Sequence, residues 1–248
     1  MSQFALKLIA LFAMLADHTV KTVLGYGSLA PAVGMETERV IRVTMLVIGR
    51  MAFPIFAWFS AEACRKTASP ARHLTRLGLF ALLSEAPFQL LFHGELTLGA
   101  TNVIVTMFLA ALAIHAAPWL EGRGIPTLPA RLFPAAAAVA LGWFLHTDYN
   151  AWGVGLMIML YYLPDQKRRL LFLTAWVTVF QLFWHGVQDG QILWLQPRGW
   201  LILQYYLGYL LAVALLACYN GKLGPKSKWL FYVFYPVHLS LLYLMGQQ

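Results

Sequence analysis

The stretch LFAMLADHTV, residues 11–20, places an aspartate beside a histidine inside an apolar run. The run covers residues 4–24, which is enough for a helix to cross the ~30 Å hydrocarbon core of a bilayer. Ionisable groups at membrane depth are costly, and they usually face the bundle interior and mark function. Asp17 and His18 therefore guide the interpretation of both the fold and the site.

The composition of the whole chain is that of an integral membrane protein. Of the 248 residues, 60% are hydrophobic and 11% are charged, and the mean hydropathy is +0.65. A soluble domain carries about 25% charged residues. Nothing between the apolar runs is long enough for a separate soluble domain, so we predict one membrane domain over residues 1–248.

Nine apolar segments predict an all-α polytopic fold of about nine transmembrane helices around an internal polar cavity. They are residues 4–24, 45–63, 74–93, 102–118, 132–146, 150–163, 169–184, 200–217 and 229–246. The fifth and sixth are short for a bilayer core, which leaves tilted or re-entrant helices open. The first lacks a basic start and contains Asp17 and His18, so we expect a retained helix rather than a signal peptide.

The loops between these segments alternate between high and low Lys and Arg content. Twelve cations lie in one set of loops: Arg65, Lys66, Arg72, Arg76, Arg123, Arg131, Lys167, Arg168, Arg169, Lys222, Lys226 and Lys228. Four lie in the other set: Lys21, Arg39, Arg42 and Arg198. The positive-inside rule then predicts an N-terminus inside and a C-terminus outside. The same cation-rich loops account for the net charge of +8, so we expect no nucleic-acid partner. In this topology Cys64 and Cys218 lie at the cytoplasmic, reducing ends of their segments, and we expect both to be packing residues.

The polar residues fall mostly toward the predicted outer side, which indicates a polar chamber that opens outward. His18 lies in the outer half of the first segment and Arg50 near the outer end of the second, while Glu85 and His238 are near mid-segment. Asn102 opens the fourth segment, and His146, Asp148, His185 and Asp189 lie in or beside outer loops.

Each of these residues also has a purely structural interpretation. The alternatives are that Asn102 caps the fourth segment, that Asp148 caps the sixth, that Lys7 is an interface anchor, that Glu62 pairs with Lys66, that Arg50 neutralises Asp17 or Glu85, and that His238 bonds a carbonyl. His18 fits such an interpretation least, because it titrates near neutrality and lies beside a carboxylate inside a span.

Helical geometry separates Asp17 from His18 and joins His18 to Lys7. Neighbouring residues point about 100° apart, so we expect Asp17 to meet another helix, with Arg50 as first candidate. Lys7 and His18 are 11 residues apart, which is about three turns or ~16 Å on one face.

Prolines lie beside three of the ionisable residues. Pro54, Pro87 and Pro236 displace the carbonyls of Arg50, Leu83 and Tyr232, and freed carbonyls in membrane helices often line sites.

Five segments in order along the chain resemble the TraX family, which is known for acetylating the N-terminal amine of F pilin. They are KLIALFAMLADH (7–18), GRMAFPIFAW (49–58), RLGLFALLSEAPF (76–88), DYNAWG (148–153) and KWLFYVFYPVHL (228–239). The arrangement of a lysine, ten residues and a histidine also resembles the wider class of transmembrane acyltransferases. In that class an acyl group passes from cytoplasmic acyl-CoA to an acceptor across the membrane.

The resemblance implies a bacterial cytoplasmic-membrane acetyltransferase that uses acetyl-CoA, needs no metal, and modifies an amine or hydroxyl of a protein or glycan, pilin being one candidate. It implies a general base at His18. The implied catalytic set is His18, Asp17, Arg50, Glu85 and His238. The implied donor-binding set is Lys7, Arg72 and Arg76. The resemblance does not identify the acceptor, and we expect Asn102, Asp148, Tyr149 and His185 to bind it.

Two other classes remain open on the residues alone. A transporter would use the polar track as a proton or solute path, although no inverted repeat is visible. A membrane assembly factor would use the same polar groups only to hold helices together.

Overall fold

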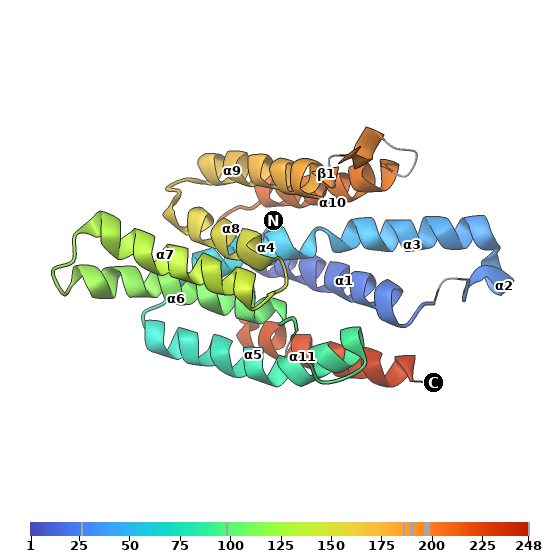
Figure 1. The fold of residues 1–248 in the computed structure, drawn as a ribbon, viewed down its shortest axis with the longest axis horizontal. Helices are drawn as coiled ribbons and strands as arrows, with labels where there is room; N and C mark the ends of the chain where they lie inside the picture. The colour runs from blue at the N-terminus through green and yellow to red at the C-terminus, as the bar shows by residue number, and fades with distance from the viewer. Residues whose placement is uncertain (26, 98, 186, 189–190, 196–198, 248) are drawn as a thin grey trace. The chain divides into compact units, whose positions relative to one another are not determined.

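The computed structural model describes residues 1–25, 27–97, 99–185, 187–188, 191–195 and 199–247, and it is almost entirely helical (Figure 1). The helices are α1 Gln3–Thr22, α2 Ala30–Val33, α3 Met35–Gly49, α4 Ala52–Lys66, α5 Pro70–His93, α6 Val103–Glu121, α7 Thr127–Phe144, α8 Asn150–Tyr162, α9 Gln166–Thr178, α10 Trp200–Ala217 and α11 Lys228–Gly246. A π-helical turn at Val179–Trp184, an antiparallel hairpin of β1 Val187–Gln188 and β2 Gln191–Ile192, and a 3₁₀ turn at Leu193–Leu195 lie between α9 and α10. The predicted all-α class is confirmed.

Each of the nine predicted segments contains a helix, but not all of them have the length and hydropathy of a membrane span. Among the described residues six helical stretches do: Gln3–Thr22, Met35–Lys66, Val103–Glu121, Thr127–Phe144, Trp200–Ala217 and Trp229–Gly246. Polar residues lower the hydropathy of α5, and α8 and α9 have only 13 residues each. The chain is thus a multi-pass membrane protein, while the count of nine and the internal cavity stay predictions.

The second segment differs most from its prediction, because its helix starts ten residues earlier. Met35–Lys66 is a 32-residue stretch that is interrupted at Arg50 and Met51, so Arg50 lies near its middle and not near its outer end. The polar start of α3 escapes a hydropathy search. Glu38 there is 1% exposed and accepts hydrogen bonds from the N–H groups of Gly27 and Leu29. Pro54 has no N–H for the carbonyl of Arg50, which explains the interruption.

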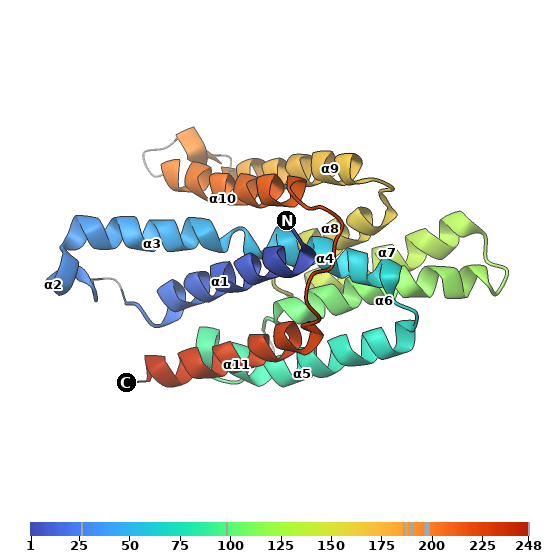
Figure 2. The ribbon, with the colours of Figure 1, turned by 180° about the vertical axis from the view of Figure 1, so that it is seen from behind.

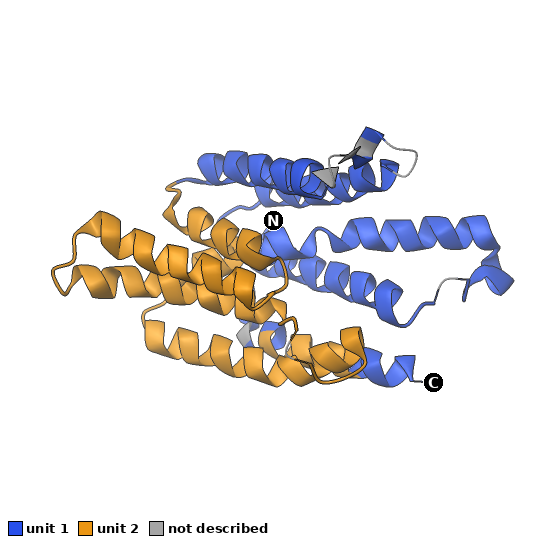
Figure 3. Ribbon diagram, in the orientation of Figure 1, with its two compact units in different colours: residues 1–56, 165–231, 241–248 blue, residues 57–164, 232–240 orange. Residues whose placement is uncertain are grey.

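The chain divides into two compact units, which Figure 3 colours separately. Unit 1 comprises Met1–Phe56, Asp165–Phe231 and Leu241–Gln248, and unit 2 comprises Ala57–Pro164 and Tyr232–Ser240. Helices α4 and α11 each contribute residues to both units.

In unit 1, α1 lies beside α3, and α10 packs on both α3 and α9 (Figures 1 and 2). Two glycines permit these close approaches. A Cβ on Gly49 would lie 2.6 Å from Oδ1 of Asp17, and a Cβ on Gly208 would lie 2.8 Å from Cβ of Arg50. Neither distance is compatible with a side chain at the glycine. The end of α3 is therefore held between α1 and α10.

The first residues of unit 1 pair with the loop that precedes α11. The N–H of Gln3 donates to the carbonyl of Lys222 at 2.8 Å, and the N–H of Phe4 donates to that of Leu223 at 3.0 Å. The N–H of Asn220 donates to the carbonyl of Met1 at 3.0 Å. This ladder fixes the beginning of α1 against a segment more than 200 residues later in the sequence.

In unit 2, α6 packs against α5, α7 and α8. The turn between α7 and α8 is backbone-strained, because His146, Tyr149 and Asn150 all have positive φ (46°, 62° and 51°). The N–H of Asp148 donates to the carbonyl of Thr101 at 2.9 Å, and the hydroxyl of Thr106 donates to the carbonyl of Asp148. These bonds tie the strained turn to the beginning of α6.

Candidate functional site

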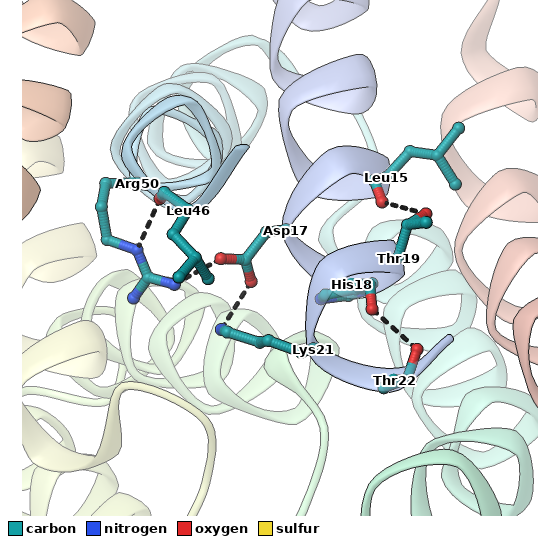
Figure 4. Close-up of polar contacts among 8 residues, drawn as sticks. All are labelled: Leu15, Asp17, His18, Thr19, Lys21, Thr22, Leu46 and Arg50. Carbon is teal, nitrogen blue, oxygen red and sulfur yellow. Dashed lines mark hydrogen bonds and ion pairs between the residues drawn. The ribbon is translucent and has the colours of Figure 1, made fainter. Parts of the chain in front are cut away.

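Asp17 of the opening stretch forms a charge cluster in unit 1 with Lys21 and Arg50 (Figure 4). Asp17 is 6% exposed, and each of its carboxylate oxygens meets a different cation. Oδ1 lies 2.5 Å from Nη2 of Arg50, and Oδ2 lies 2.6 Å from Nζ of Lys21 one helical turn away. The predicted pairing of Asp17 with Arg50 is confirmed, and Lys21 joins a pair that the sequence analysis took to involve only two residues.

Arg50 is the residue around which this part of unit 1 is organised. It is the C-cap of α3, and its Nε lies 3.4 Å from the carbonyl of Leu46 (Figure 4). Its guanidinium lies 5.4 Å from the ring centre of Tyr205 on α10, a cation–π distance. The carboxylate, the carbonyl and the aromatic face together compensate the partly buried positive charge of Arg50.

His185 lies within the electrostatic reach of Arg50, directly after the π-helical turn. Its ring packs edge-on against Phe180 at 4.5 Å between centroids. Desolvation, with a smaller contribution from the positive charge of Arg50, lowers the pKa of His185 below its ordinary value. The structure thus places this predicted acceptor-binding residue in unit 1, near the Asp17–Arg50 pair.

His18 lies on the same uninterrupted helix as Lys7, as the sequence spacing required. Its side chain is half-buried, and its carbonyl accepts a hydrogen bond of 2.7 Å from the hydroxyl of Thr22. Lys7 is also half-buried, with Nζ 5.0 Å from the ring centre of Phe231. Asp17 points toward Arg50 and Lys21 (Figure 4), so its carboxylate is engaged by cations on both oxygens.

A second polar cluster lies in unit 2 at the beginning of α6. Asn102 is fully buried, and its side-chain oxygen caps α6 by accepting from the N–H of Ile104 at 2.9 Å. Its Nδ2 donates to Glu85 at 2.6 Å and to the carbonyl of Ala81 at 2.9 Å. Gln89 donates to the other oxygen of Glu85 at 2.7 Å. The capping role of Asn102 is confirmed, and the same side chain also links α6 to Glu85.

The middle of α11 contributes two aromatic residues to unit 2. His238 is 3% exposed, its Nδ1 lies 2.9 Å from the carbonyl of Phe234, and its ring stacks on Phe234 at 4.7 Å. This confirms the structural alternative for His238. Tyr235 is 4% exposed and lies within the electrostatic reach of Asp148 and Glu85. The ring of Tyr235 also packs against that of His238, with centroids 5.4 Å apart.

Among the other residues that the sequence singled out, Asp189 and Arg198 lie outside the part of the chain that the structure describes. The N-cap of α8 is Tyr149 and has no side-chain cap bond, so the alternative that Asp148 caps this helix is wrong. Arg72 is exposed, and Arg76 hydrogen-bonds the phenol of Tyr232. Lys7 belongs to unit 1 and the two arginines to unit 2, so the donor set is divided between the units.

The catalytic set is divided in the same way. Asp17, His18 and Arg50 lie in unit 1, and Glu85 and His238 lie in unit 2. The predicted pair of Glu62 and Lys66 is confirmed at 3.0 Å, with Arg65 as an additional partner of Glu62 at 3.4 Å.

The sequence did not predict that Gly49 and Gly208 allow α1 and α10 to approach Arg50 closely. It also did not predict roles for Gln89 and Tyr235. A signal for Tyr235 was present, because FYPVHL places it three residues before His238 and thus on nearly the same helical face. The glycines carry no local signal, since the backbones that they approach are distant in sequence.

The fold and the two clusters define a multi-pass helical membrane protein with buried, internally compensated charges. Within that class the family is specific: residues 2–246 match the TraX protein family, and the chain belongs to it. It is also similar to the probable fimbrial assembly protein FimC, serogroup H1, of Dichelobacter nodosus, with 26% identity over 97% of this chain and 94% of the relative. No solved structure matches the chain.

Proposed function

We propose that this protein is a membrane-embedded acetyltransferase that moves an acetyl group from cytoplasmic acetyl-CoA to an amine or hydroxyl at the outer face of the bacterial inner membrane. The N-terminal amine of a pilin is the first candidate acceptor. The observation that carries the proposal is the arrangement on α1, where Lys7 and His18 lie about three turns apart on one helix. Membership of the TraX family and the name of the fimbrial relative support an acceptor in pilus biogenesis.

In the proposed reaction His18 is the general base. The acceptor amine attacks the thioester carbonyl carbon, and His18 takes the proton that the nitrogen loses. The new C–N bond forms as the C–S bond breaks, and the departing thiolate of CoA receives a proton. A positioned base contributes about 10²–10⁴-fold to such a step.

The ion pair beside His18 would keep this base in position. Asp17 joins α1 to Arg50, and Arg50 in turn contacts Tyr205 of α10. Gly49 and Gly208 let both helices approach Arg50 closely. A catalytic group must be held to within a fraction of an ångström, and a buried ion pair between packed helices supplies such rigidity.

Lys7 would meet the donor toward the predicted cytoplasmic end of α1. An ammonium is a suitable point charge for a CoA phosphate, and the pantetheine arm of CoA would then extend along α1 over the ~16 Å toward His18. Arg72 and Arg76 are further candidates for phosphate contacts. In the acceptor set, Asn102, Asp148 and Tyr149 lie around the strained turn of unit 2, where ordered strain is typical of binding sites.

The decisive experiment incubates purified full-length protein in detergent with acetyl-CoA radiolabelled in the acetyl group. Two synthetic peptides with the N-terminal sequence of the pilin from the same bacterium serve as acceptors, one with a free amine and one with a blocked amine. We expect label on the free peptide only, together with release of CoA. Label on neither peptide and no CoA release would contradict an acetyltransferase for this acceptor, and solute flux in vesicles would instead favour a transporter.

An assembly factor without catalysis is the second candidate, and the name of the Dichelobacter relative is the observation in its favour. It predicts that a catalytically silent protein still supports pilus formation. A His18→Ala variant that restores normal, unacetylated pili to a deletion strain would favour a combined role. A strain whose pili are acetylated normally without the protein would exclude the transferase.

A further inference from the structure

Three potential metal-ligating side chains meet in unit 2, near Arg72 and Arg76 of the predicted donor-binding set. They are Cys64 near the end of α4, His73 in the first turn of α5 and His115 near the end of α6. Their ligand atoms all lie within 4.8 Å of one another. Cys64 is 5% exposed and His73 3% exposed, while His115 is half-buried.

The spacing of the two imidazoles agrees with the edge of a metal tetrahedron. Nδ1 of His73 and Nε2 of His115 are 3.3 Å apart. Two nitrogens that bind one zinc at about 2.05 Å with a tetrahedral angle lie about 3.3 Å apart, and a sulfur at about 2.3 Å lies about 3.6 Å from each. The two rings are close to perpendicular, at 81°. The sulfur of Cys64 lies within 4.8 Å of a ring nitrogen of each histidine.

We propose that Cys64, His73 and His115 bind a metal ion, with zinc as the best fit to one thiolate and two imidazoles. Three protein ligands leave a fourth coordination position, which a water molecule would fill. The ion would join the ends of α4 and α6 to the beginning of α5. The predicted acetyl transfer needs no metal, so this metal site is separate from the proposed activity.

A simple hydrogen bond between the two histidines is the competing explanation. A single N–H···N bond accounts for the 3.3 Å distance, but it gives no role to the buried thiol of a third helix at the same point. A metal accounts for all three side chains, because a soft thiolate and imidazoles are the ligands that zinc selects. It also predicts proton release on binding, since the thiol must ionise.

The test uses cobalt(II) as a spectroscopic substitute for zinc, in full-length protein freed of metal with a chelator. The key variant is Cys218→Ser. The chain has two cysteines, so Cys64 is the only thiol left in this variant, and Cys218 lies in unit 1. We expect anaerobic cobalt to give a thiolate-to-cobalt charge-transfer absorption, and we expect zinc to remove it by competition. The intensity should saturate at one cobalt per chain.

Ligand variants then assign the site. Cys64→Ser should abolish the charge-transfer absorption, and His73→Gln and His115→Gln should each weaken cobalt binding by about tenfold or more. His93→Gln, at the exposed end of α5, is the matched control and should bind as the parent does.

Two results would overturn the proposal without reliance on the folding of any ligand variant. One is cobalt bound by the Cys218→Ser protein without any thiolate absorption. The other is the lack of stoichiometric cobalt or zinc binding at micromolar metal, which would leave the cluster as a hydrogen-bonded network only.

Discussion

At the scale of single residues, a change at His18 distinguishes a catalytic role of the polar residues on α1 from a purely structural one. We expect His18→Ala to lower acetyl transfer by about 10²–10⁴-fold, the usual contribution of a general base. The measurement is turnover of labelled acetyl-CoA, with thermal unfolding recorded on the same samples. His93→Ala, on the exposed end of α5, should retain parental turnover. A folded His18→Ala protein with parental turnover would remove His18 from the mechanism.

Asp17 and Arg50 should behave as one unit in a double-mutant cycle. Removal of one partner leaves a buried charge without compensation, which typically costs about 3–5 kcal/mol in a protein interior. Lys21 remains beside Asp17 when Arg50 is changed, so we expect Arg50→Gln to cost less than Asp17→Asn does. The two changes together should cost less than their sum, as read from denaturation midpoints.

The exposed pair of Glu121 and Arg131 is the matched control for that cycle. It is a single contact of 3.2 Å between side chains that are 31% and 48% exposed. Exposed ion pairs contribute about 0–1 kcal/mol, so Arg131→Gln should leave the midpoint almost unchanged. Full additivity of Asp17→Asn and Arg50→Gln would contradict the buried pair.

His185 should make stability depend on pH. Its pKa in the folded protein lies below 6.5, because of desolvation and the charge of Arg50. Between the two pKa values the unfolded chain binds more protons than the folded one, so stability falls as the pH is lowered through 6.5. His185→Gln should flatten the dependence of the unfolding midpoint between pH 7 and pH 5. Because His185 is exposed, we expect a small effect.

Several residue-level features were predictable because their physical reason can be read from the sequence around a single residue. The Glu62–Lys66 pair follows from helical spacing, and the Asn102 cap follows from its place before an apolar run. The Asp17–Arg50 pair follows from the need of a buried carboxylate for a cation. The Cys64, His73 and His115 cluster was not predictable in this way, because its three residues meet only through the packing of three helices.

At the scale of helices, the two close approaches in unit 1 should be sensitive to a single methyl group. Gly49→Ala forces a Cβ against Asp17 and should separate α1 from α3, with a cost of about 1–3 kcal/mol. Gly155→Ala in α8 is the control, since nothing lies within 4 Å of its Cβ position. That change should be neutral or slightly stabilising, as alanine favours helix. Equal midpoints for both variants would contradict the packing of α1 on α3.

The helices themselves were largely predictable from apolar runs, but their ends and breaks were not. Hydropathy finds the apolar half of Met35–Lys66 and misses the start of α3, where Glu38 is buried by hydrogen bonds that no local pattern indicates. The turn before α8 adopts positive φ at three residues other than glycine, which only its tertiary bonds explain.

At the scale of the whole molecule, the membrane orientation is the testable consequence of the cation bias. A reporter enzyme fused after Lys226 should lie in the cytoplasm, and one fused to the C-terminus should lie outside, because α11 has the length and hydropathy of a span. Reporter activity and protease protection measure the side. Both fusions on one side would contradict a membrane-crossing α11 and the depth assigned to His238.

The backbone hydrogen bonds between residues 1–4 and residues 220–223 can form only after the second of these segments has been synthesised. At about 5–20 residues per second, a ribosome completes the second segment about 10–45 s after the first. Arg50 follows Asp17 by 33 residues, which is about 2–7 s. During those seconds Lys21, one helical turn away, is the nearest cation to Asp17 in the sequence. The rate of translation between the codons of Asp17 and Arg50 thus sets the time between synthesis of the carboxylate and synthesis of its arginine partner.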